Sequence, residues 1–226
     1  MTTPRPEWLR RLAGREDIAG HEWFTTYAPP DGHGRQSAVL ILFGPDPAGG
    51  EDVVLTERAH TLRSHPGQVS FPGGALDPED GGHVEAALRE AEEEVGLDPA
   101  GVEVVATFPP LFLAPSSNAV TPVLAWWPDP VPVGVVDRRE VERVVRVPVA
   151  ELVDPAHRFT AVFGPYRGPA FEAGGLFVWG FTAMLLSTVL DLAGLARPWD
   201  SGLERELPTR VRSPWMRALD GPEGLP

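Results

Sequence analysis

The chain has no cysteine and no lysine among its 226 residues. The absence of cysteine excludes disulfide bonds, thiolate nucleophiles and cysteine-ligated zinc. All 19 basic residues are arginine, so any cationic side chain that binds phosphate must be arginine or protonated histidine. The N-terminal segment MTTPRPEWLRRLAG lacks the apolar run of a secretory signal, and we therefore expect a cytoplasmic protein.

The net charge of −13 disfavours nucleic-acid binding, which needs a basic surface. It does not exclude a small phosphorylated substrate, because a local arginine loop or a metal ion can reverse the field at one site. Residues 173–190 carry no charge and reach the lower limit of a membrane span. Their glycine and hydroxyl residues favour a short strand followed by a buried helix, so we expect neither nucleic acid nor a membrane as a partner.

Length and patterning favour one α/β domain with two extensions. We expect an N-terminal extension at 1–34, the domain at 35–196 and a surface tail at 197–226. The long polar loop at 57–74 is expected to carry function, as ordered loops of this length often do. Strands are expected at 37–43, 53–56, 102–108, 120–127 and 141–149, helices at 5–13, 149–153 and 181–195, and a late hairpin at 158–163 and 171–179.

The segment GGHVEAALREAEEEVGLDP, residues 81–99, predicts an amphipathic helix with crowded carboxylates. Like charges three or four positions apart on a helix repel, so the crowding costs stability. A hard divalent cation shared by the carboxylates would remove that repulsion. A solvated acidic face is the alternative interpretation. The apolar stripe consists of Val84, Ala87, Leu88, Ala91 and Val95, and the crowded carboxylates are Glu90, Glu92, Glu93 and Glu94.

The helix pattern R-E-A-E-E-E-V-G-L resembles the Nudix box, G-x5-E-x7-R-E-U-x-E-E-x-G-U, where U is aliphatic. The first half departs from the box, because Ala75 and Gly81 stand where glycine and glutamate are required. One inserted residue restores the match, with Gly74 as the glycine and Asp80 in place of the first glutamate. The second half matches at Arg89, Glu90, Ala91, Glu93, Glu94, Gly96 and Leu97.

The preceding segment VLTERAHTLRSHPGQVSFPGG, residues 54–74, resembles the signature of the coenzyme A pyrophosphatase branch, L-L-T-x-R-[S/A]-x3-R-x3-G-x3-F-P-G-G. Only Val54 departs, and conservatively. VWGFTA at 178–183 is similar to the start of this branch's last helix, so the resemblance runs from about residue 35 to 190. The matching positions are Leu55, Thr56, Arg58, Ala59, Arg63, Gly67, Phe71, Pro72, Gly73 and Gly74.

The resemblance implies the Nudix α/β/α sandwich with a mixed β-sheet and an enzyme that hydrolyses a diphosphate linkage with Mg²⁺ or Mn²⁺. Divalent ions neutralise the diphosphate and lower the pKa of bound water. Glu90 and Glu94 are the implied principal metal ligands, with Glu93 and the Gly74 carbonyl as additional ones. Arg89 would hold Glu93 and the helix in register, so the implied catalytic set is Glu93, Glu94 and Arg89.

The general base and the substrate contacts are less strongly indicated. Glu93, or Glu140 or Glu142 in the segment DRREVERVV, is a candidate base, and surface charge is the alternative for the last two. Arginine offers a fork of donors that suits phosphate. The expected recognition surface consists of Arg58, Arg63, His65 and Gln68, each of which has a structural role as its alternative.

The function implied by the resemblance is hydrolysis of coenzyme A or acyl-coenzyme A to 3′,5′-ADP and 4′-phosphopantetheine or its acyl form. Three alternatives stay open: another substrate such as NADH, ADP-ribose or a dinucleoside polyphosphate; a nucleotide-binding regulator without turnover; and a purely structural acidic helix. Trp199, Trp215 and Met216 are candidates for a homodimer interface.

Overall fold

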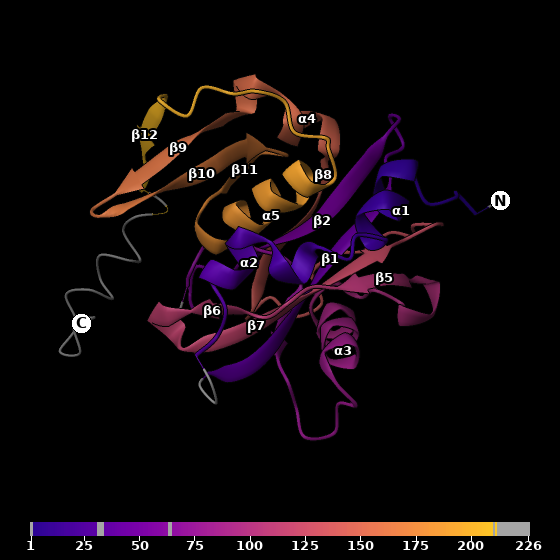
Figure 1. Ribbon diagram of the computed structural model, residues 1–226. Coiled ribbons are helices and arrows are strands. Elements are labelled where there is room, and N and C mark those ends of the chain that lie inside the picture. The colour runs from indigo at the N-terminus through magenta and orange to yellow at the C-terminus, as the bar shows by residue number, and fades with distance from the viewer. Residues whose placement is uncertain (1, 31–33, 63–64, 210, 212–226) are drawn as a thin grey trace.

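A computed structural model describes residues 2–30, 34–62, 65–209 and 211 of the chain. Its elements build two sheets, with helices on both faces of the larger one (Figure 1). The α-helices are α1 (Glu7–Ala13), α2 (Glu22–Thr26), α3 (His83–Val95), α4 (Val149–Val153) and α5 (Gly180–Leu192). Short 3₁₀ turns are η1 (Ile18–Gly20), η2 (Pro99–Gly101), η3 (Ala114–Ser116) and η4 (Pro155–His157).

The larger sheet has the order β3-β2-β1-β7-β5, with β4 also paired to β1, β6 to β7 and β8 to β2. Strands β1 and β7 are parallel and the other pairs of this sheet are antiparallel, so the sheet is mixed as expected. Its strands are β1 (Arg35–Pro45), β2 (Glu51–Arg58), β3 (Val69–Ser70), β4 (Gly73–Ala75), β5 (Glu103–Thr107), β6 (Leu111–Leu113), β7 (Asn118–Trp126) and β8 (Val141–Pro148).

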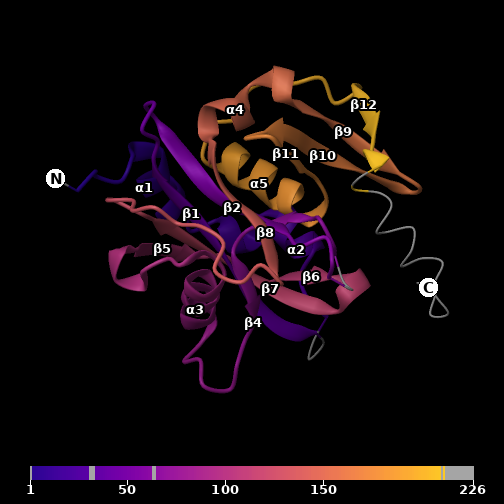
Figure 2. The same cartoon turned by 180° about the vertical axis from the view of Figure 1, so that it is seen from behind.

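Alternation along β1 explains why both faces of this sheet are covered. Successive side chains of a strand point to opposite faces. Leu40 and Leu42 lie in an apolar cluster with Ala87 and Ala91 of α3. Ile41, one position along, lies in the other cluster with residues of α5. Figure 1 and Figure 2 show α3 and α5 on opposite sides of the sheet, so the α/β/α sandwich is confirmed.

The N-terminal segment packs into the main core. Trp8 and Leu9 of α1 and Phe24 of α2 are buried in the cluster that also contains α5. Trp8 lies edge-on to Phe43 with ring centroids 5.1 Å apart. The Trp126 indole nitrogen donates to the Thr3 carbonyl at 3.0 Å. Helix α1 was expected within 5–13, whereas α2 was not expected, because five residues show too little periodicity.

The expected late hairpin was wrong in its pairing. Strands β9 (Arg158–Phe163), β10 (Tyr166–Ala173) and β11 (Leu176–Val178) form a second sheet with β12 (Glu204–Glu206), in the order β11-β10-β9-β12. The predicted strand 171–179 therefore contains a turn. Gly174 and Gly175 both have positive φ, at 58° and 69°, which ends one strand and starts the next. The loop 57–74 likewise contains β3 and the start of β4.

The segment after residue 197 does not lie wholly on the surface, as the sequence had suggested. Strand β12 pairs in parallel with β9, and Leu207 is only 3% exposed. Trp199, a candidate dimer residue, stacks over the buried Arg158 guanidinium of the same chain at 4.7 Å. Trp215 and Met216 lie outside the described residues. None of the helices in the described ranges is both long and apolar enough to cross a membrane.

Candidate active site

Helix α3 ends where its sequence requires. Gly96 adopts the left-handed conformation at φ 72°, and its N–H donates to the Glu92 carbonyl at 3.0 Å. This is the glycine stop typical of helix C-termini. The apolar stripe of Ala87, Ala91 and Val95 is buried against the sheet. Docking of that stripe turns Glu90 and Glu94 toward the strand that carries Gly73 and Gly74.

Glu94 is buried, with 5% of its surface exposed. Its Oε2 accepts a hydrogen bond from the Gly73 N–H at 3.2 Å. Burial raises the pKa of Glu94 to about 7, the Gly73 hydrogen bond opposes the rise, and the neighbouring Glu90 adds to it. A carboxylate in this position is poorly solvated and has only one described hydrogen bond. A bound cation would therefore stabilise its charged form.

Glu90 is the second carboxylate of the pair. Its side chain is 17% exposed and its Oε1 lies 3.3 Å from Nη1 of Arg89. Burial raises its pKa, while the Arg89 charge lowers it. A methyl group added to Gly74 would overlap the Glu90 carboxylate, and one added to Gly73, at φ 154°, would overlap the Ala38 carbonyl. The two glycines thus let the backbone approach both carboxylates.

Arg89 is held by Asp80, the residue that replaces the first glutamate of the box. Its Nε and Nη2 each lie 3.0 Å from a different Asp80 oxygen, a bidentate pair. Nη2 also donates to the Ala75 carbonyl at 3.0 Å. These bonds lower the pKa of Asp80 and raise that of Arg89. The loop thus reaches the helix although aspartate is one carbon shorter than the glutamate of the box and one extra residue separates it from Arg89.

Glu93 lies on the outer side of this arrangement. Its side chain is 60% exposed and pairs with Nη1 of Arg89 at 3.3 Å. In the described part of the chain, no three acidic or histidine side chains are arranged to hold a metal ion. Glu90 and Glu94 fit a divalent cation as a pair of oxygen ligands, and Mg²⁺ commonly uses one or two carboxylates plus water and substrate phosphate. The roles of Glu93 and the Gly74 carbonyl stay predictions.

The recognition loop, which is the long polar segment at 57–74, reaches this pair through Gly73. The Arg58 N–H donates to the Gln68 carbonyl at 2.8 Å. The positive charge of Arg58 lowers the pKa of Glu94. Burial lowers the pKa of His65, whose side chain bonds to Gln68. The Nε of Arg58 is buried and has no hydrogen-bond partner among the described residues. Arg63 lies outside the described residues.

The two candidate bases are placed differently. The Glu140 carbonyl accepts from the Ala59 N–H at 2.8 Å, and the Glu140 charge raises the pKa of both Glu90 and Glu94. Glu142 is an exposed residue of β8, and no described interaction joins it to the carboxylate pair. The structure therefore ties the backbone of Glu140 to the recognition loop at Ala59, and both candidate bases are exposed.

Sequence reasoning missed how the loop before Glu140 is held. The Gly134 N–H donates to the Val95 carbonyl at 3.1 Å, and the Val136 N–H donates to the Glu94 carbonyl at 3.2 Å. These bonds satisfy carbonyls at the end of α3, which a helix leaves without intrahelical partners. No periodicity could have revealed them, because the loop follows α3 by about forty residues and three strands.

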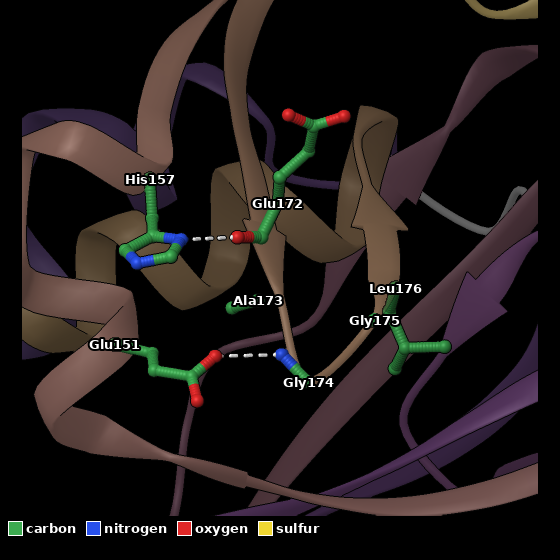
Figure 3. Close-up of a pocket in the computed structure, with 7 residues that line it drawn as sticks. All are labelled: Glu151, His157, Glu172, Ala173, Gly174, Gly175 and Leu176. Carbon is green, nitrogen blue, oxygen red and sulfur yellow. Dashed lines mark hydrogen bonds between the residues drawn. The ribbon is translucent and has the colours of Figure 1, made fainter.

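A hollow of about 250 Å³ lies at the turn between β10 and β11 (Figure 3). Glu151 accepts from the Gly174 N–H at 2.8 Å, and His157 bonds to the Glu172 carbonyl at 2.6 Å. These side chains satisfy the backbone of the turn. None of the lining residues belongs to α3 or to the recognition loop, so we assign the hollow no part in the chemistry.

Comparison with known proteins agrees with this geometry. The model of the NUDIX domain matches residues 33–165. Two curated relatives, each an uncharacterized Nudix hydrolase NudL, come from Escherichia coli (strain K12 / DH10B) and Shigella boydii serotype 4. Each is 38% identical over 157 residues, which are 67% of this chain and 79% of the relative.

A solved structure, the Nudix hydrolase RenU of M. smegmatis, is similar in fold. It has a TM-score of 0.53 and 20% sequence identity, with 76% of this chain and 99% of that chain covered. At this identity the likeness concerns the fold alone. The match of the domain model over more than half of the residues, together with the curated relatives, shows that the chain belongs to the Nudix hydrolase family.

Proposed function

We propose that this Nudix hydrolase cleaves the diphosphate linkage of coenzyme A or acyl-coenzyme A, with Mg²⁺ or Mn²⁺, to 3′,5′-ADP and 4′-phosphopantetheine or its acyl form. The observation that carries the proposal is the contact of Gly73 with Glu94, in which the Gly73 N–H donates to Oε2 at 3.2 Å. It joins the segment that resembles the coenzyme A pyrophosphatase signature to the acidic pair. A cationic fork next to buried carboxylates suits a substrate with an additional phosphate.

The residues divide the work by position. Glu90 and Glu94 would hold the divalent ion, which when bound neutralises diphosphate charge and activates water. Arg89, fixed by Asp80, keeps the helix and its carboxylates in register. Arg58 and Gln68 bind substrate phosphate, with Arg63 and His65 as further contacts. Glu140 takes a proton from the attacking water as the general base, and the Ala59 N–H of the recognition loop holds its backbone at 2.8 Å.

The direct test is chromatographic. The pure protein is incubated with coenzyme A and Mg²⁺, with and without chelator, beside NADH and ADP-ribose. We expect metal-dependent release of 3′,5′-ADP from coenzyme A, faster than turnover of the other two. Cleavage of another diphosphate but not of coenzyme A would contradict the proposed substrate and still support a hydrolase. Nucleotide binding without any cleavage would favour a regulator instead.

A matched pair of variants excludes a purely structural acidic helix. Glu94→Gln removes one carboxylate of the pair but keeps an acceptor for the Gly73 N–H, and we expect activity to fall at least about a hundredfold, since metal stabilisation is worth several kcal/mol. Glu92→Gln, an exposed neighbour on the same helix, should keep wild-type activity. If both variants kept full activity, the carboxylates would have no catalytic role.

A further inference from the structure

Two hydroxyl groups lie on the face of the larger sheet that α3 covers. Val54 of β2 belongs to the apolar cluster that contains residues of α3. Thr56, two positions later, points to the same face, because side chains of a strand alternate. Val69 and Phe71 lie in the cluster on the α5 side, so Ser70, between them, also points to the α3 face. We call Thr56 and Ser70 the hydroxyl pair.

The hydroxyl pair is bonded across two strands. Thr56 and Ser70 are direct partners in the pairing of β2 with β3, and their hydroxyl oxygens lie 2.9 Å apart. The Thr56 oxygen also lies 3.3 Å from the Ser70 carbonyl. Thr56 is 1% exposed, whereas Ser70 is partly exposed. Each hydroxyl carries one proton. When Thr56 donates to the Ser70 hydroxyl, its shorter contact, the Ser70 proton is left for an acceptor outside the pair.

The hydroxyl pair lies next to the acidic pair along the chain. Three residues lead from Ser70 to Gly73, a span of at most about 11 Å. The Gly73 N–H donates to Glu94 of α3 at 3.2 Å, so Glu94 approaches from the face to which Ser70 points. In the other direction, Gln68 accepts at its carbonyl from the Arg58 N–H. Ser70 therefore stands in sequence between the arginine of the recognition loop and the residue that contacts Glu94.

We propose that the Ser70 hydroxyl, held by Thr56, donates a hydrogen bond to a non-bridging oxygen of the substrate diphosphate. The inference rests on the proposed function and adds a neutral donor to the substrate site. Two metal–oxygen bonds of about 2 Å each would set a phosphate oxygen about 4 Å from a ligating carboxylate oxygen, and the second phosphate extends further along the face. A hydroxyl suits this place, because it forms no ion pair with Glu90 or Glu94 that would compete with the metal.

The test measures binding without turnover. Methylenediphosphonate, whose P–C–P bridge a hydrolase does not cleave, is titrated into the full-length protein with Mg²⁺ by calorimetry. Ser70→Ala should weaken binding about tenfold to a hundredfold, the usual contribution of a hydrogen bond to a charged group. Ser70→Thr keeps the hydroxyl and should stay within about threefold of wild type. Equal affinities of wild type and Ser70→Ala, or no binding by wild type, would overturn the inference.

Ser37 on β1 provides the matched control. It is 8% exposed, and its neighbour Ala38 lies in the cluster with α3, so Ser37 points to the opposite face. Its hydroxyl has no hydrogen-bond partner among the described residues. Ser37→Ala should therefore leave the affinity unchanged.

A double variant separates a substrate contact from a fastening of two strands. Thr56 is expected to act through Ser70, so Thr56→Val should cost no further affinity in the Ser70→Ala background. If the hydroxyl pair only fastened β2 to β3, both single variants would lower the melting temperature and keep the affinity of wild type. That result would overturn the inference.

A thiol gives a second readout, which also serves if Ser70→Ala does not fold. The chain has no cysteine, so Ser70→Cys carries a single thiol of similar shape. Saturating methylenediphosphonate with Mg²⁺ should slow the reaction of this thiol with a maleimide at least about fivefold, because access controls thiol reactivity. Mg²⁺ alone should leave the rate unchanged. The same rate with and without methylenediphosphonate would contradict a contact at Ser70.

The failures of the two proposals are distinguishable. Cleavage of coenzyme A by wild type, together with unchanged diphosphonate affinity in Ser70→Ala, would overturn the Ser70 contact and leave the proposed function. Diphosphonate binding that depends on Ser70, without cleavage of coenzyme A, would support the contact and overturn the proposed function.

Discussion

At the scale of single residues, the carboxylates that we propose as metal ligands are ionised only at a cost, because burial raises their pKa. Glu94 is buried with one described hydrogen bond, and Glu90 lies against glycine backbone. Glu93, which follows the same helix pattern, is exposed and occupied by Arg89. Identical side chains in one run therefore have different environments, and the buried ones are the carboxylates that we propose to bind a cation.

Replacement of Glu140 and Glu142 tests the assignment of the general base. Glu140→Gln should lower kcat by about a hundredfold to ten-thousandfold, the usual contribution of a general base. It should also remove from the pH–rate profile the limb that corresponds to deprotonation of the base. Glu142→Gln serves as the control, because Glu142 is an equally exposed neighbour in sequence that no described interaction joins to the pair, and its kcat should match wild type. Equal kcat values for wild type and both variants would leave Glu93 as the candidate general base.

At the scale of elements, the short strand β12 makes the segment after α5 part of the fold. It pairs with β9, and the Thr160 hydroxyl donates to the Ser201 carbonyl at 2.7 Å. Leu207 completes a small cluster with Phe159 and Phe177 of the second sheet. The polar, proline-rich composition of this segment pointed to the surface, whereas pairing with an existing sheet edge satisfied its backbone.

Leu207→Ala measures how much this element contributes. Leu207 is 3% exposed, so its truncation should lower the free energy of unfolding by roughly 2–4 kcal/mol. Leu203→Ala, at a position 41% exposed in the same segment, should change it by less than about 1 kcal/mol. Urea unfolding curves give both values. Equal effects of the two variants would mean that the cluster around Leu207 adds no stability.

At the scale of the whole molecule, one sheet separates the acidic helix from the main core. Strand β2 crosses this sheet and carries Asp52, which is 3% exposed. Asp52 is paired with Arg146 of β8 at 2.8 Å. Burial nevertheless raises the pKa of Asp52 to about 6, and the attraction of Arg146 only partly offsets it. The molecule thus keeps an ion pair whose charged form is costly.

This carboxylate should make global stability depend on pH. Its folded pKa of about 6 lies above the ordinary aspartate value of 3.8, so its contribution is fully present below about pH 4 and is lost as pH rises through 6. Relative to Asp52→Asn, wild type should lose up to about 3 kcal/mol between pH 4 and 7. Thermal unfolding of both proteins across this range checks the trend. The opposite trend would show that Arg146, rather than burial, sets the pKa of Asp52.

Periodicity and spacing alone determined much of this protein. The features of α3 were predictable because they are local to one helix and its turns. They are the apolar stripe of Ala87, Ala91 and Val95, the glycine stop at Gly96 and the run of carboxylates. The family resemblance followed from the same local spacing. The apolar runs of β1 and β7 likewise marked the central strands of the sheet, because buried strands need continuous apolar residues.

Only the tertiary structure decided which of these residues meet. Contacts such as Val136 to Glu94, Ala59 to Glu140 and Thr182 to Val69 join segments far apart in the chain. Nothing in the local sequence encodes them, since they arise when packed layers bring loops together. Burial, which raises the pKa of Glu94 but leaves Glu93 in solvent, is likewise a property of the assembled fold. The sequence therefore determined the groups available for chemistry, and packing determined their environment.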